Sequence, residues 1–163
     1  MSYAFQNNTI GMPPVTTIDA AAKMPLGTMG YAVDPVLGGA EFVYLPGAAN
    51  TVLGSLVTYN QATPTTTLAA TGAQNGNPVA VAMAPVLAGQ FGWYQICGQA
   101  RIAKTTGAAI ALGAALLLSA TAGAIVTAAT PGAAGTLDSA FCCVAALSTD
   151  TTVAAQISRP ALN

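Results

Sequence analysis

The chain has 163 residues, of which 53% are hydrophobic and only 6% are charged, with four basic side chains, five acidic ones and no histidine. A single domain of this length can bury a sizeable core. Four basic residues are too few to neutralise the phosphates of DNA or RNA, so we expect no nucleic-acid partner. Sparse charge and a formal net charge of −1 favour association with other proteins.

The first 30 residues show no sustained hydrophobic period, and their prolines hold the backbone extended. We predict an extended N-terminal arm over residues 1–30. The arm is more apolar than a purely solvated tail needs, so we expect it to order by lying on a neighbouring subunit or on a larger surface. Its candidate interface residues are Tyr3, Phe5, Ile10, Met12, Val15 and Ile18.

From residue 31 onward, short apolar runs alternate with turn signals such as Asp34-Pro35 and Gly38-Gly39. The runs have the length of strands rather than of helices, and they predict a single β-rich domain over residues 31–163. The threonines at 65–67 are expected to belong to a polar connection. The expected strands are 41–45, 53–59, 79–86, 93–102, 109–112, 116–119, 124–128, 141–147 and 152–158.

The clearest strand is 93–102, where residue types alternate with a period of two. Successive side chains of a strand point to opposite faces. One face, directed to the core, carries Tyr94, Ile96, Ala100 and Ile102, and the other carries Gln95, Gln99 and Arg101. Trp93 packs in the core or anchors an interface, and Arg101 is either a solvated strand end or the partner of an acidic group on another protein.

The segment 54–100 recurs, in degraded form, at 113–161. GSLVTYN at 54–60 aligns with GAALLLS at 113–119, VAVAMA at 79–84 with CCVAAL at 142–147, and WYQICGQA at 93–100 with VAAQISRPA at 153–161. A duplication would give two similar β-meander halves that close against each other and leave few free edges. The predicted fold is therefore all-β, a small β-barrel or β-sandwich with an extended N-terminal arm.

The uncharged run 105–137 is long enough to cross a lipid bilayer. It is interrupted by Gly113, Ser119 and Gly123, and it lacks flanking basic clusters and aromatic anchors. We therefore predict no membrane span. The N-terminus also lacks a basic segment followed by an apolar one, so we expect no classical secretory signal.

Residues that carry chemistry are scarce. Without histidine, neither a cysteine nucleophile nor a zinc site has its usual partners, and the adjacent Cys142 and Cys143 do not have metal-ligand spacing. We interpret Cys97, Cys142 and Cys143 as small buried apolar side chains. The glycines separate strands rather than joining a strand to a helix, as a phosphate-binding loop requires. We expect no catalytic, cofactor-binding or metal site, and no enzymatic activity.

The order of features resembles the small decoration, or cement, proteins of tailed-bacteriophage heads. The resemblance covers roughly residues 31–161. It is carried by GSLVTY at 54–59, PVAVA at 78–82, AGQFGWYQICGQA at 88–100, AIALGAAL at 109–116 and GAIVT at 123–127. It implies a β-rich structural protein that binds the outside of the mature capsid, often as a trimer, and clamps neighbouring major capsid proteins.

On this interpretation the partners are the major capsid protein and further copies of the chain, with a homotrimer favoured over a dimer. The protein would be made in the host cytoplasm and would reside on the outer capsid surface of the virion. Low charge and strands rich in threonine and alanine also allow a second interpretation, a self-assembling fibre, pilus or surface-layer subunit.

Overall fold

The computed structural model describes residues 4–5, 13–60, 62–71, 76–127 and 135–162. The fold is all-β, as the sequence predicts, and the described residues contain no helix. The strands are β1 (Ala4–Phe5), β2 (Ile18–Asp19), β3 (Met29–Asp34), β4 (Gly38–Pro46), β5 (Leu56–Asn60), β6 (Thr65–Leu68), β7 (Val79–Ala82), β8 (Phe91–Ala103), β9 (Ala115–Leu118), β10 (Ile125–Thr127), β11 (Thr136–Val144) and β12 (Thr152–Leu162).

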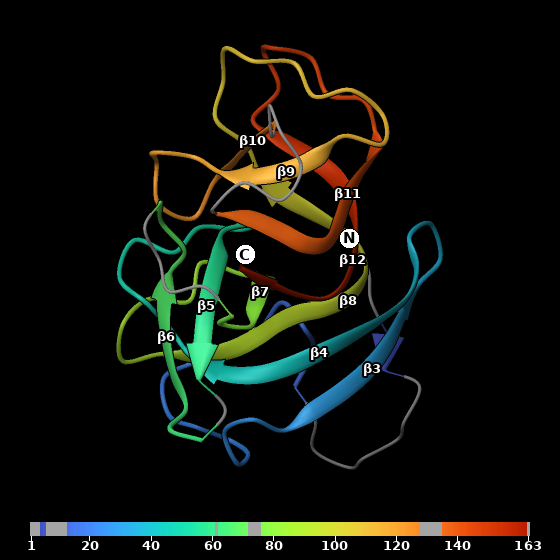
Figure 1. Ribbon diagram of the computed structural model, residues 1–163. Coiled ribbons are helices and arrows are strands. Elements are labelled where there is room, and N and C mark those ends of the chain that lie inside the picture. The colour runs from blue at the N-terminus through green and yellow to red at the C-terminus, as the bar shows by residue number, and fades with distance from the viewer. Residues whose placement is uncertain (1–3, 6–12, 61, 72–75, 128–134, 163) are drawn as a thin grey trace.

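The strands form one sheet that curls into a half-barrel (Figure 1). Its main path runs β1-β3-β4-β8-β12-β11-β9-β10. Four strands lie off this path. β2 pairs with β8, β7 pairs with both β5 and β8, and β6 pairs with β5. This architecture is consistent with the predicted barrel or sandwich, in which curling brings strand edges towards one another.

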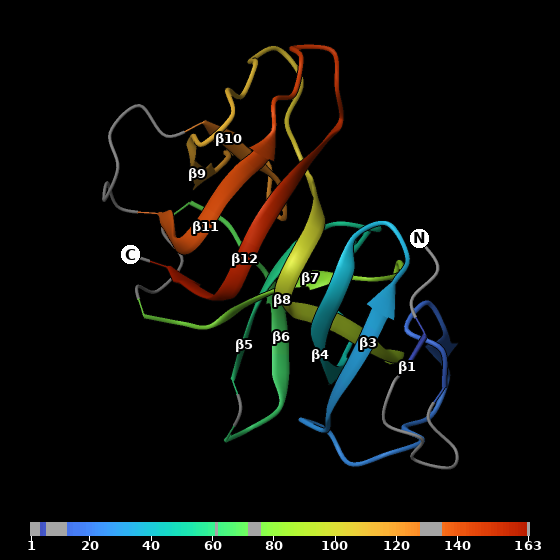
Figure 2. The ribbon, with the colours of Figure 1, turned by 90° about the vertical axis from the view of Figure 1, so that its right-hand side faces the viewer.

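The long strand β8 connects the two parts of the sheet. It pairs with β4 over Phe91–Cys97 and with β12 over Cys97–Ala103. Figure 2 shows β8 passing from β3 and β4 at one end of the molecule to β11 and β12 at the other. Gly98, whose φ is +101°, follows the residue at which β8 changes its partner. The strand that the sequence identified as the clearest is thus the one on which both parts of the fold depend.

Side chains of β8 enter three hydrophobic clusters, which explains its length. Ala100 and Ile102 pack in a cluster with β9, β11 and β12, while Tyr94 and Ile96 pack in another with β5 and β7. All four are at most 2% exposed, so their predicted inward orientation is confirmed. Trp93 belongs to a third cluster with residues of β3 and β4.

Gln95 corrects the predicted outward face of this strand. Its side chain is 1% exposed rather than solvated, because the first half of β8 is covered on both faces. The buried amide is satisfied by donating to the backbone oxygens of Cys97, at 3.1 Å, and of Gln99, at 3.0 Å. In the second half, Gln99 is partly exposed and Arg101 is exposed, as predicted.

The pairing of β5–β8 repeats in β9–β12. β5 pairs with β6 and β7, and β7 pairs with β8. In the same way, β9 pairs with β10 and β11, and β11 pairs with β12. Leu56 faces Val81 and Ala115 faces Phe141, so Val81 corresponds in register to Phe141, three residues before the Val144 that the sequence alignment matches to it. Before each leading strand, a glycine N–H donates to the third strand, from Gly54 to Ala82 and from Gly113 to Cys142. The two segments compared in the sequence therefore have the same local topology.

Residues 13–30, which belong to the predicted arm, lie against this chain's own domain. Val15 is 2% exposed within the cluster of Trp93, and the indole Nε1 of Trp93 donates to the carbonyl oxygen of Pro13 at 3.1 Å. Strand β2 pairs with the start of β8, and β3 begins before residue 30. In the described part of the chain, residue 30 therefore does not separate an arm from a domain.

Two predicted segments differ in the structure. Thr65–Leu68 is a strand rather than a connection, because β-branched threonines suit a pleated surface and the hydroxyls of Thr58 and Thr67 are hydrogen-bonded at 2.8 Å. The expected strand 109–112 is absent from the described strands. Only Ile110 pairs there, through an isolated bridge to Ala146.

A buried ionic group holds the 13–30 segment to β4. The Asp19 carboxylate accepts a hydrogen bond of 2.7 Å from the Tyr44 hydroxyl and lies 3.2 Å from Lys23 Nζ. Burial, with this hydrogen bond as a second cause, raises the pKa of Tyr44 to about 12. Burial also raises the pKa of Tyr94. Both phenols are therefore held in their neutral form by the fold.

We expect the protein to lose stability at alkaline pH. The pKa of Tyr44 is about 12 in the folded chain against a usual value of 10.0, so its stabilising effect is complete below about pH 10 and disappears as the pH rises towards 12. Urea unfolding measured between about pH 8 and pH 12 tests this. Tyr44→Phe should flatten the decline without abolishing it, because Tyr94 still titrates. A free energy of unfolding that stays constant over this range would contradict the prediction.

Candidate interaction surface

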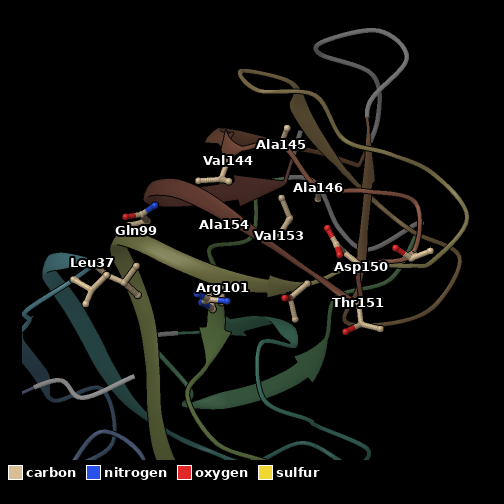
Figure 3. Close-up of a pocket in the computed structure, with 13 residues that line it drawn as sticks. Leu37, Gln99, Arg101, Val144, Ala145, Ala146, Asp150, Thr151, Val153 and Ala154 are labelled. Carbon is tan, nitrogen blue, oxygen red and sulfur yellow. The ribbon is translucent and has the colours of Figure 1, made fainter.

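An open groove of about 690 Å³ lies between the β3–β4 turn and the β11–β12 hairpin. Val36 and Leu37 of the turn form one side, and Gln99 and Arg101 of β8 contribute polar groups. Figure 3 shows Arg101 on β8, with Leu37 towards one end of the view and Asp150 and Thr151 towards the other. The rest of the lining comes from residues 144–146 and 149–154.

Strand register explains why these side chains meet. Arg101 pairs with Ala154, and Ala154 pairs with Val144, so the three residues lie side by side on β8, β12 and β11. Beside them, Gln99 Nε2 donates to Cys143 Sγ at 3.1 Å. Because Ile102 points into the core, Arg101, which alternates with it along β8, faces the groove. The groove is thus polar at β8 and apolar at the end of β11.

Two ion pairs account for four of the charged side chains. Lys23 pairs with Asp19, and Arg159 Nη2 lies 2.8 Å from Glu41 Oε2. Arg159 Nε also donates a hydrogen bond of 3.1 Å to the same oxygen. This hydrogen bond and the charge of Glu41 raise the pKa of Arg159. Arg159 and Glu41 therefore already have a partner within the chain.

Three further charged side chains interact with the backbone. Asp34 caps its own turn by accepting from two N–H groups, at 2.8 and 2.9 Å, and Asp150 Oδ2 accepts from Leu147 N at 2.7 Å. Lys104 is 5% exposed and donates to the backbone oxygens of Thr105 and Asp150, at 3.1 and 3.3 Å. Only Arg101 and Asp138 are left, and neither has an ion pair or side-chain hydrogen bond with any described residue.

Large apolar side chains are exposed in the connections between strands. The most exposed are Val36 at 85%, Leu112 at 70% and Leu147 at 68%. Exposed apolar residues occur singly on most proteins, but here they accompany a surface that is nearly free of charge. Further members of this set are Val52, Leu53 and Leu87. We call these six residues the apolar turn residues.

The predicted interface residues are divided by the structure. Val15 and Trp93 are buried in the chain's own core, so in this conformation they cannot contact a partner. Ile18 is 37% exposed and Arg101 is exposed in the groove. Phe5 belongs to β1, where its backbone pairs with Ala32. The remaining predicted contacts, Tyr3, Ile10 and Met12, lie outside the described residues.

Sequence reasoning missed the apolar turn residues and Asp138. A large aliphatic side chain beside turn residues, as in Asp34-Pro35-Val36, was a usable signal, because a turn exposes whatever it carries. Asp138 gave no comparable signal. Only the three-dimensional structure shows that its carboxylate has no ion pair or side-chain hydrogen bond with any described residue.

The cysteines form no disulfide. Cys142 is buried, and burial raises the pKa of its thiol, while Cys97 and Cys143 are partly buried. In the parts of the chain that the structure describes, no group of three or more His, Cys, Asp or Glu side chains could hold a metal ion. These parts also contain no helix that is long and apolar enough to span a membrane. Neither models of known protein families nor curated protein sequences match this chain.

Proposed function

We propose that this protein is a structural decoration protein that binds the outer surface of a bacteriophage capsid and clamps neighbouring major capsid proteins. The proposal starts from the resemblance carried by residues 31–161. The observation that supports it best is the set of apolar turn residues on a surface with hardly any charge. Folding alone gives no reason to expose Val36 at 85%, whereas burial against a partner would stabilise the contact.

A clamp works by burying surface of two neighbours at once. Each apolar turn residue can enter a pocket of a capsid protein, while the sheet behind it keeps the turns in place. Because many copies bind one shell, a modest binding free energy at each site sums to a large resistance of the shell to rupture. The role requires no catalytic group, and we propose that the protein is not an enzyme.

Sedimentation with purified capsid shells tests the proposal. We expect the chain to pellet saturably with shells and to remain in solution without them. The double variant Val36→Ser/Leu147→Ser should weaken binding by about a hundredfold or more, since burial of each side chain contributes about 1.5–3 kcal/mol. Ala20→Ser, which alters another exposed residue, is the matched control.

Two outcomes would reject the capsid role. A chain that pellets by itself as filaments would identify a fibre, pilus or surface-layer subunit instead. A chain that never sediments with shells would have no capsid site. Unchanged binding of the double variant, with shells bound by the unaltered chain, would show that Val36 and Leu147 are not the contacts.

A further inference from the structure

Arg101 and Asp138 carry opposite charges, and neither is neutralised by a described residue of its own chain. We propose that they neutralise each other between two copies: Asp138 of one copy binds Arg101 in the groove of the next. The inference adds the contact between copies to the proposed function, and it does not depend on capsid binding.

The two side chains are too far apart along the sheet to pair within one chain. Arg101 lies beside Ala154 and Val144, at the last residue of β11, whereas Asp138 lies near the start of that strand. Asp138 precedes Val144 by six positions in β11, which corresponds to about 20 Å at the usual rise of a strand. A contact between them therefore requires a second molecule.

Charge complementarity favours a second copy as the occupant. In this chain the other charged side chains are already held by ion pairs, turns or backbone carbonyls. A carboxylate that fits the Arg101 guanidinium is therefore present on the protein itself. Asp150 also lines the groove, but its carboxylate caps the turn at Leu147 and lies beyond ion-pair distance of Arg101.

Exposed apolar side chains occur on the strand that carries Asp138 and in the groove that contains Arg101. Phe141 of β11 is 48% exposed, and the groove exposes Val36 and Val144 at 85% and 56%. When such side chains meet, they exclude water from the ion pair, which strengthens an attraction that is weak at an open surface. The same burial supplies the apolar area that a stable contact between subunits needs.

A contact between Arg101 and Asp138 of different copies is reciprocal in a twofold dimer. In a head-to-tail arrangement it produces a closed ring when the rotation between copies closes and a filament when it does not. A ring of three would agree with the trimer that the phage resemblance implies. In every case each copy uses its groove once and its Asp138 once.

Charge reversal tests the contact on the purified full-length chain. At low ionic strength, sedimentation equilibrium should show a small oligomer that dissociates as salt is added. Arg101→Glu and Asp138→Arg should each raise the dissociation constant at least tenfold, because each places like charges together. The combined variant Arg101→Glu/Asp138→Arg should recover association, since the reversed charges again complement each other.

Ala20→Glu, which adds a charge at another exposed site, is the matched control and should associate like the unaltered chain. Circular dichroism and thermal unfolding of each variant separate dissociation from unfolding. A monomeric unaltered chain, unchanged association of either single variant, or no recovery in the combined variant would overturn the inference. A monomer that still sediments with shells would remove this contact and leave the capsid role standing.

Discussion

Trp93→Ala is expected to lower the free energy of unfolding by about 3–5 kcal/mol, the range for removing a large aromatic side chain from a packed core. Trp93 is 0% exposed, and its ring meets that of Tyr44 edge-on at a centroid distance of 5.3 Å. Its indole N–H also binds the Pro13 oxygen. The substitution therefore removes packing between β4 and β8 and detaches the backbone that covers them.

Urea unfolding of Trp93→Ala and Phe141→Ala side by side checks this prediction. Both changes remove an aromatic ring from the sheet, but Phe141 is 48% exposed, so its loss should cost about 1 kcal/mol or less. Limited proteolysis should also cut the segment 13–28 faster in Trp93→Ala. If the two substitutions lowered the free energy of unfolding equally, Trp93 would not be a core residue. That result would instead favour the interpretation of Trp93 as an interface anchor.

The contrast between the two halves of β8 shows how far a period of two can predict burial. Alternation predicted Tyr94, Ile96, Ala100 and Ile102 correctly, because those positions face the core in either half. It failed for Gln95, since the first half is covered on both faces by segments from elsewhere in the chain. The sequence pattern of a strand shows the polarity of its own side chains, but it does not show which other segments pack against them.

The fold class could be predicted because turns and short apolar runs are local signals. The order of the strands in the sheet could not be predicted. β8 pairs with β4 in its first half and with β12 in its second, and both pairings join residues that are distant in sequence. Weak local signals also produced the errors at Thr65–Leu68 and Ile110. Threonine suits both strands and loops, and an apolar residue can be buried through a single bridge.

The candidate surface was predictable only in part. Arg101 was identified because it stands on the outward face of a clear strand, and the structure leaves it exposed. Its groove arises because the tip of the β3–β4 hairpin and the β11–β12 hairpin flank that face, and no sequence pattern records this approach. Whether a charged side chain is paired is likewise a tertiary property. The sequence therefore indicated one member of the proposed contact, and the structure was needed to identify the other.

Gly98→Ala is expected to lower the free energy of unfolding by about 2–5 kcal/mol, because it adds a steric clash to an unfavourable backbone conformation. At a φ of +101°, residues other than glycine are strained. A Cβ there would also lie 2.6 Å from the Gly39 oxygen and 3.0 Å from Ala40 Cα. Both are backbone atoms of β4, so they cannot move aside without shifting the strand at the point where β8 changes its partner.

Gly107→Ala separates these two effects. Gly107 has nearly the same φ, +102°, but a Cβ there would meet nothing within 4 Å, so only the backbone strain of about 1–2 kcal/mol applies. The extra loss in Gly98→Ala, measured by urea unfolding, is then the cost of separating β4 from β8. Equal losses at both positions would mean that β4 can shift freely at Gly39. The junction at Cys97 would then not hold the two parts of the sheet in a fixed relation, and the groove between their hairpins would lose its defined width.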